Sequence, residues 1–456
     1  MEDGYSSKEK VESAHGGHEK IAVNGAHDET TAALAETNEI DPQVEKRIRR
    51  KLDLHIVPIL FGIWLLAFLD RANIGNAAIA GLTESTNAAG NKFNTALAIF
   101  YVPYICIDVP SNLVLKYFRA GYYIPGLLIA WGIVATFTGF VKSYGGLLAV
   151  RFFLGLCEGG LLGGMVIYLA MFYKRHELLF RIGMFYSAAP LSGAWGGLLS
   201  SGLAEISTPG YPGWPFIFVS SGRPITELRF AKHYSQFIEG AITVVFGCIV
   251  IWFLPHTPND ANFLTEEERH LASARLRSGL QGTTQKDAKY ETFSWDKVKR
   301  ALLNVNTLLL SLLFFFLITP IYSYSLFLPT ILEQFGYELF ITQLLTVPPN
   351  TLAFLTVLVT CWLSDKFQRR GIFMLGWIVV GIAGYIMLIA SPSKNVEYGG
   401  TFLVAAGIFP CSPLVMGWLA NNLAPHYVRA TGTGFQIMIA NCAAFIATFT
   451  YTSSDA

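Results

Sequence analysis

From Leu54 onward, the sequence is a succession of long apolar runs separated by short polar connections. A helix of about 20 mainly apolar residues spans the hydrocarbon layer of a membrane, and a helix satisfies its own backbone polar groups there. The runs therefore predict an all-α membrane protein of eleven transmembrane helices. The predicted helices begin near Leu54, Phe93, Tyr122, Gly146, Phe180, Phe237, Asn304, Ile341, Gly371, Tyr398 and Thr431.

The composition adds to this prediction and excludes several other classes of protein. Hydrophobic residues make up 52% and charged residues 14% of the chain, whereas soluble domains carry about a quarter charged residues. The balance favours a lipid bilayer as the surroundings. The 33 basic residues nearly match the 32 acidic ones, which gives no sign of a nucleic-acid partner. The cysteines stand singly, and no ATP-binding G-x-x-x-x-G-K-[ST] motif occurs, so we expect no metal or other cofactor.

The N-terminal segment differs from the rest of the chain. Residues 1–40 are polar and contain no apolar run that a signal peptidase would recognise, so we expect a disordered cytoplasmic tail. Asp41 and Pro42 then suit the N-cap and first turn of a helix. A basic cluster between Lys46 and Lys51 precedes the first apolar run, which indicates that the N-terminus is cytoplasmic.

A second polar stretch divides the apolar runs. Residues 256–302 are expected to form a cytoplasmic linker, in which Thr265-Glu266-Glu267-Glu268 predicts the capping box of an amphipathic helix. The linker separates a predicted N-terminal six-helix bundle, residues 41–255, from a C-terminal bundle of five helices, residues 303–456.

Four charged residues lie inside the predicted membrane helices: Asp70 and Arg71 in the first, Arg151 and Glu158 in the fourth. A charge at membrane depth costs about 3 kcal/mol or more, so each charge needs a partner or a function. Arg151 and Glu158 are seven residues apart, which is nearly two turns, so they share one helix face about 10 Å apart along the axis. The four residues predict a site where arginines bind an anion and acids take protons.

Other interpretations of these polar residues stay open. The four charges can instead pin neighbouring helices together as buried ion pairs. Tyr104 can line a substrate cavity or bond a neighbouring helix. Asn421, Asn422, Gln436 and Asn441 can form the C-terminal side of the site, although hydrogen bonding between helices is the simpler interpretation. The same two interpretations apply to Tyr322 and Tyr324 in the seventh predicted helix.

Six motifs together carry a resemblance to a known family. They are DRANIGNA (Asp70–Ala77), YVPYICIDVPSNLVLKYF (Tyr101–Phe118), RFFLGLCEGG (Arg151–Gly160), YKRHELLFR (Tyr173–Arg181), QLLTVPP (Gln343–Pro349) and WLANNLAPHYVRATGTGFQ (Trp418–Gln436). With them the chain resembles the major facilitator superfamily, and within it the fungal allantoate permease group of the anion:cation symporters.

The resemblance implies two pseudo-symmetric helical bundles around a central cavity, which opens to each side of the membrane in turn and uses a proton gradient. It also implies roles for individual residues. Arg71 and Arg151 fall on substrate-binding positions, Asp70 and Glu158 on proton-coupling positions, and Tyr104 on a substrate-contacting tyrosine.

Two departures from the family pattern are visible. Residues 219–236 stand where family members run directly into the next helix, and we expect an atypical insert such as a translated intron. The chain carries eleven predicted helices, whereas the fold has twelve, so we expect a truncated C-terminal bundle.

Taken together, the residues and the resemblance predict proton-coupled symport of a small organic anion, a carboxylate such as nicotinate, allantoate or a vitamin. The expected protein is a monomer in a fungal plasma membrane and not an enzyme. Two alternatives are efflux of a product of a secondary-metabolite gene cluster and a non-functional truncated remnant.

Overall fold

The computed structural model describes residues 41–77, 86, 88, 90–115, 118–141, 143–195, 231–278, 294–333, 335–337, 339–390, 393–423 and 426–450. The predicted tail (residues 1–40) and most of the predicted insert (219–230) lie outside these residues, as do residues 451–456. The chain divides into two compact units at Arg49 and Arg50, and every contact between helices described below lies within the second unit.

The described part of the chain consists of helices and their connections, with no strand. This confirms the predicted all-α class. The N-terminal helices are α2 (Pro42–Ala77), α4 (Asn91–Val114), α5 (Ala120–Thr138), α6 (Tyr144–Glu158), α7 (Leu161–Ala170), α8 (Leu178–Tyr186) and α10 (Ala231–Phe253). After them come η3 (Pro258–Asp260), α11 (Glu266–Ser278), α13 (Trp295–Leu302), α14 (Val305–Glu333), α15 (Leu339–Leu345), α16 (Val347–Phe367), α17 (Arg370–Ala390), α18 (Lys394–Ile408), α19 (Cys411–Asn422), α20 (His426–Asn441) and α21 (Ala443–Thr450).

Nine helical segments in the described residues are long and apolar enough to cross a membrane. They account for nine of the eleven predicted helices. The predicted helix near Phe180 is described only to residue 195, as α8 and a further turn-interrupted segment. The predicted helix near Phe237 corresponds to α10, whose apolar part, Gly240–Phe253, is shorter than a full span. The total of eleven therefore stays a prediction.

Two predicted helix starts are confirmed by their hydrogen bonds. Helix α2 begins at Pro42, and the Asp41 carboxylate accepts a hydrogen bond from the Gln43 backbone N–H at 2.9 Å. At the start of α11, the Thr265 backbone N–H donates to Glu268 Oε2 at 3.0 Å, and the Glu268 N–H donates to Thr265 Oγ1 at 3.3 Å. This reciprocal pair is the predicted capping box, which satisfies backbone donors that the first turn leaves free.

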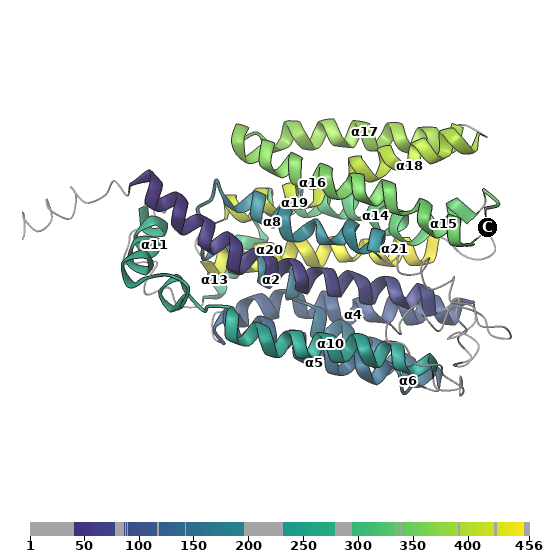
Figure 1. The fold of residues 1–456 in the computed structure, drawn as a ribbon, viewed down its shortest axis with the longest axis horizontal. Coiled ribbons are helices and arrows are strands. Elements are labelled where there is room, and N and C mark those ends of the chain that lie inside the picture. Colours follow the sequence, from purple (N-terminus) through teal and green to yellow (C-terminus); the bar gives the residue numbers. More distant parts are fainter. Residues whose placement is uncertain are drawn as a thin grey trace, which may run out of the picture. The chain divides into compact units, whose positions relative to one another are not determined.

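The helices of the two sequence halves pack against each other along three lines of contact. Helix α4 packs against α20 and α21, α8 against α16 and α19, and α7 against α20. Two further pairs, α17 with α18 and α10 with α5, lie side by side at opposite edges of the bundle (Figure 1). The contact of α4 with α20 is close, because a Cβ added at Gly434 would lie 3.1 Å from the Val109 Cα.

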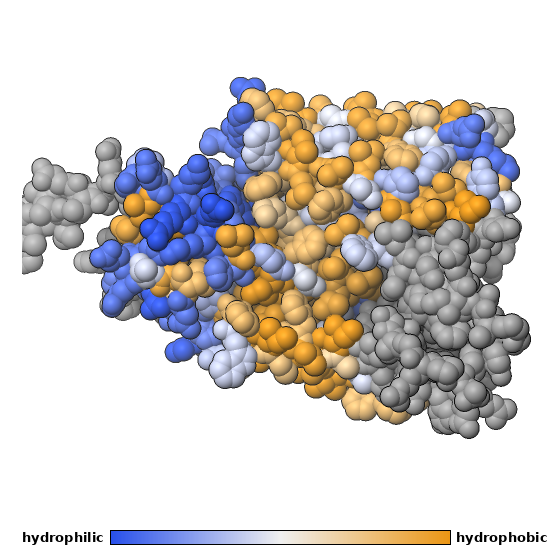
Figure 2. Space-filling model, viewed as in Figure 1, coloured by the Kyte–Doolittle hydropathy of each residue, from blue (hydrophilic) through white to orange (hydrophobic). Residues whose placement is uncertain are grey.

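On the face of the second unit that Figure 2 shows, polar side chains gather where α11 and α13 lie in Figure 1, and apolar side chains cover most of the helical bundle beside them. Helix α11 is tied to the N-terminal half by two ion pairs. Lys51 Nζ lies 2.6 Å from Glu268 Oε2, and Arg275 pairs with Glu177. The linker helix therefore associates with the N-terminal half.

Gly155 lies where the backbone of α6 closely approaches that of α4. A Cβ at this position would lie 2.0 Å from the Phe100 carbonyl oxygen, and a helix backbone cannot move aside cheaply. We expect Gly155→Ala to lower the free energy of unfolding by about 1–3 kcal/mol. The measurement is the midpoint of thermal unfolding of the purified protein in detergent.

Gly126 in α5 provides the matched control, because no described atom lies within 4 Å of a Cβ added there. Gly126→Ala should leave the midpoint unchanged or raise it slightly, since alanine favours a helix. Equal midpoints for the two variants would contradict the close approach.

Candidate functional site

Arg71 and Glu158 come from different helices and form an ion pair inside the bundle. Arg71 lies near the C-terminal end of α2, and Glu158 is the last residue of α6. Arg71 Nη2 donates to Glu158 Oε1. The side chains are 13% and 0% exposed, so little solvent reaches the pair. Removing one partner from such a buried pair leaves an uncompensated charge, which costs about 3–5 kcal/mol.

The sequence of α6 accounts for the position of Glu158. Leu147, Arg151, Leu154 and Glu158 recur at helical spacing, and all four are buried. The structure thus places Arg151 and Glu158 on one buried face, as their spacing predicts.

A break in the fourth membrane span ends α6 at the residue that pairs with Arg71. Gly160 has a φ of 82°, in the left-handed region that glycine adopts readily, and α7 begins at the next residue. The Gly160 backbone N–H donates to Asp108 Oδ1 at 3.1 Å. Asp108 is fully buried in α4, so a carboxylate of one helix stabilises the break in another.

Aromatic rings surround the Arg71 guanidinium. Its carbon lies 5.6 Å from the centroid of Trp64 and 5.2 Å from that of Phe68, both on α2. The rings of Phe100 and Tyr104, on α4, lie at 5.8 and 5.4 Å. The negative faces of aromatic rings attract a cation at these distances, and more strongly where water is excluded. The rings hold the guanidinium in place without neutralising it.

Asp70 lies beside the pair but faces a different helix. Its Oδ2 accepts a hydrogen bond from Trp131 Nε1 of α5 at 3.2 Å. Two guanidinium groups attract the carboxylate, and the attraction to Arg151 is stronger than the attraction to Arg71. Arg151 itself is 6% exposed. The four predicted charges therefore lie in one buried region of the N-terminal half.

A small cavity lies next to Arg71, between helices of the two sequence halves. The volume of the cavity, measured as the space open to the centre of a water molecule, is about 20 Å³. One or two water molecules fit, since each needs about 10–15 Å³ on this measure. An organic substrate needs several hundred cubic ångströms, so the described conformation is closed to it. The lining residues are Trp64, Phe68, Arg71, Tyr104, Leu162, Tyr186, Phe314, Ile318, Ile321, Tyr322, Ile437, Ala440 and Asn441.

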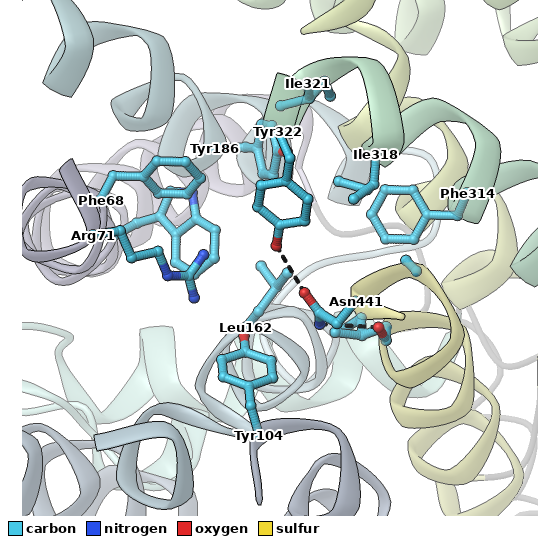
Figure 3. A pocket seen from close by; sticks show the side chains of 13 residues that line it. Phe68, Arg71, Tyr104, Leu162, Tyr186, Phe314, Ile318, Ile321, Tyr322 and Asn441 are labelled. Carbon is cyan, nitrogen blue, oxygen red and sulfur yellow. Dashed lines mark hydrogen bonds between the residues drawn. The ribbon is translucent and has the colours of Figure 1, made fainter. Parts of the chain in front are cut away.

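The polar groups of the cavity converge from three sides (Figure 3). Arg71 points inward from α2, Tyr104 from α4 and Tyr322 from α14. The Tyr322 hydroxyl donates to Asn441 Oδ1 of α20 at 2.8 Å. Tyr104 and Asn441, both predicted as substrate-binding residues, thus lie at the same cavity as Arg71.

The structure does not bring every predicted site residue to this cavity. Gln436 is fully buried, and its Nε2 lies 3.4 Å from the carbonyl oxygens of Leu310 and Val415. This arrangement is the hydrogen bonding between helices that the sequence favoured as the simpler interpretation. Arg151, like Gln436, is not among the described residues that line the cavity.

Sequence reasoning missed several residues that lie around Asp70 and Arg71. Trp64, Phe68, Trp131 and Tyr186 lie in apolar runs, where an aromatic residue is usually a packing or lipid-facing residue. A partial signal was present for Trp64 and Phe68, which precede Arg71 by seven and three residues and so share its helix face. No signal in the sequence indicated Trp131 or Tyr186, because their contacts come from other helices.

A bundle of membrane-spanning helices with a charged cavity between its two halves has the architecture of a membrane transporter. The profile of the Major Facilitator Superfamily matches residues 60–448, and the chain belongs to this superfamily. It is a multi-pass membrane protein, and the members that it resembles are transporters.

Three similar proteins illustrate the relationship. The chain is 34% identical over 419 residues to an uncharacterized transporter of Schizosaccharomyces pombe, which covers 91% of this chain and 79% of that protein. It is 32% identical over 449 residues to the major facilitator-type transporter hxnP of Emericella nidulans, and the match covers 96% of this chain and 85% of that protein. Among solved structures, the proton:xylose symporter XylE has a TM-score of 0.63 at 13% identity, and the match covers 87% of this chain and 88% of that protein. This similarity shows a shared fold.

Proposed function

We propose that this chain is a proton-coupled secondary transporter of a small organic anion, within the allantoate permease group of the superfamily. We further propose that it acts as a monomer in the plasma membrane with a cytoplasmic N-terminus. The observation that carries the proposal is the buried Arg71–Glu158 pair, whose arginine lines the central cavity.

The pair offers a physical route from proton uptake to anion binding. While Glu158 is ionised, it holds the Arg71 guanidinium and competes with any anion in the cavity. A proton on Glu158 removes that competitor, and the buried guanidinium then needs another negative partner. A substrate carboxylate fits the planar donor geometry of arginine with two parallel hydrogen bonds. Proton uptake and anion capture therefore favour each other.

The closed cavity agrees with alternating access. A substrate enters only when the contacts between the two halves open, because the described cavity has room for one or two water molecules. When Glu158 is protonated and Arg71 is paired with the substrate carboxylate, these three groups together carry no net charge. Closure of the cavity then buries no net charge. Loss of the proton to the less acidic side returns Arg71 to Glu158 and releases the anion.

Asp70 and Arg151 are proposed to act behind this pair. Their mutual attraction gives a second acid and base in the same buried region. A proton on Asp70 would weaken its attraction to Arg151 and so change the electrostatic potential at Arg71. Asp70 is therefore proposed, with Glu158, as a proton-coupling residue.

The test is transport by the full chain in liposomes of neutral phospholipid. A panel of radiolabelled carboxylates, beginning with nicotinate and allantoate, is supplied outside at pH 5.5 with pH 7.5 inside. We expect at least one carboxylate to accumulate more than in protein-free liposomes, and to do so less when both sides are at pH 7.5. Accumulation that ignores the pH gradient, or no protein-dependent accumulation of any anion, would contradict the proposal.

A further inference from the structure

The lining of the central cavity limits the chemistry of its substrate. Arg71 is the one charged side chain among the described residues that line the cavity. The other polar side chains are three tyrosines, Asn441 and Trp64 with its single indole N–H donor, and the remaining lining is aromatic or aliphatic. From this lining we infer that the substrate is a flat, largely apolar molecule with a single carboxylate, of the aromatic monocarboxylate class. The inference rests on the proposed function, because it refines the anion that Arg71 binds.

A single cation favours a single negative charge. Arg151, the second predicted anion-binding residue, is not among the described lining residues, and it is the main attractive charge for Asp70. A second carboxylate on the substrate would face rings and aliphatic side chains without a cation. Burial of an unpaired charge is far more costly than burial of an apolar group. Dicarboxylates are therefore disfavoured.

The hydrogen-bonding groups of the cavity are few and partly occupied. Tyr322 donates its hydroxyl hydrogen to Asn441 Oδ1, and Asn441 Nδ2 donates to the Ile437 carbonyl at 3.0 Å. A polyhydroxylated acid would lose its bonds to water on entry and find few replacements. Each unsatisfied hydroxyl costs about 1–3 kcal/mol. The lining therefore discriminates against sugar acids.

Aromatic rings face the cavity from both sequence halves. Phe68 and Tyr104 belong to α2 and α4, whereas Phe314 and Tyr322 belong to α14 (Figure 3). When the halves separate to admit a substrate, these rings become opposite walls of the opening. Rings bind a flat ring by offset stacking or edge contacts, which adds about 0.5–1.5 kcal/mol for each pair beyond the burial of apolar area.

The test is ligand binding by the full chain in detergent, measured as the shift in the midpoint of thermal unfolding. The probes are benzoate, benzamide, phthalate and gluconate at equal concentrations and constant pH and ionic strength. A ligand that binds the folded protein raises the midpoint in a concentration-dependent way. We expect benzoate to raise it, and we expect the uncharged benzamide, the dicarboxylate phthalate and the polyhydroxylated gluconate to raise it much less.

Two phenylalanine variants connect the shift to the cavity. Phe68→Leu should raise the benzoate concentration for the half-maximal shift about tenfold, because a stacking partner is lost. Phe316→Leu in α14 is the matched control, since Phe316 is 63% exposed on the bundle surface and does not line the cavity. It should leave the benzoate response unchanged. An equal response of both variants would overturn the inference, as would a shift with phthalate or gluconate that matches that of benzoate.

The outcome is separable from that of the proposed function. Stabilisation by benzoate without any pH-driven uptake would contradict proton coupling and leave the substrate class in place. Proton-driven uptake of gluconate, with no benzoate binding, would support the proposed function and overturn the substrate class.

Discussion

Replacing Glu158 with glutamine is expected to abolish the response of uptake to an imposed pH gradient while exchange of substrate across the membrane continues. Glutamine keeps the size of the side chain and its carbonyl acceptor but carries no exchangeable acidic proton. Arg71 then remains available to the substrate at every pH, so binding no longer depends on proton uptake. In liposomes preloaded with unlabelled substrate, exchange of labelled substrate should persist, while accumulation driven by an outside pH of 5.5 should fall to the level without a gradient.

Glu266 provides the control for this substitution. It is an exposed residue in the first turn of α11, far in sequence from the cavity helices, and it is not among the cavity-lining residues. Glu266→Gln should respond to the pH gradient as the unmodified protein does. If Glu158→Gln also retained the full response, Glu158 would not carry the coupled proton.

The double variant Arg71→Met/Glu158→Gln is expected to fold but to transport nothing. Neutralising both partners removes a buried pair without leaving a lone charge, which is often tolerated or even stabilising. Arg71→Met alone leaves Glu158 without its partner and should be the less stable protein. The measurements are the midpoint of thermal unfolding and gradient-free exchange of a carboxylate that the unmodified protein transports.

This double variant separates the two interpretations of the intramembrane charges. If the pair only pins helices together, its neutral replacement should still exchange substrate. The Arg275–Glu177 pair is a suitable comparison, because its side chains are 1% and 3% exposed and neither residue lines the cavity. Arg275→Met/Glu177→Gln should keep exchange activity, although it loosens α11. Equal activity of the two double variants would favour the structural interpretation.

Much of this protein follows from its sequence. A hydrophobic run of about 20 residues predicts a membrane helix by itself, because a helix in lipid forms its backbone hydrogen bonds within the same segment. The starts of α2 and α11 were likewise predictable, since a capping side chain and its N–H partner lie within three residues of each other. The rarity of charges inside the spans also singled out Arg71 and Glu158.

The positions of the site residues depended on contacts between distant helices. The sequence did not indicate that Arg71 pairs with Glu158, or that Arg71 lines the cavity while Arg151 is not among the described lining residues. Those outcomes depend on how each helix is rotated, and packing against other helices sets that rotation.

The sequence alone determined the class of protein, the membrane-spanning segments and the few charges that need a function in lipid, because these properties belong to single helices. Only the tertiary structure decided which arginine lines the cavity and which rings surround it. A cavity between helices is formed by side chains from several segments of the chain. The pattern of residues within one segment does not predict which residues of other segments will lie next to it.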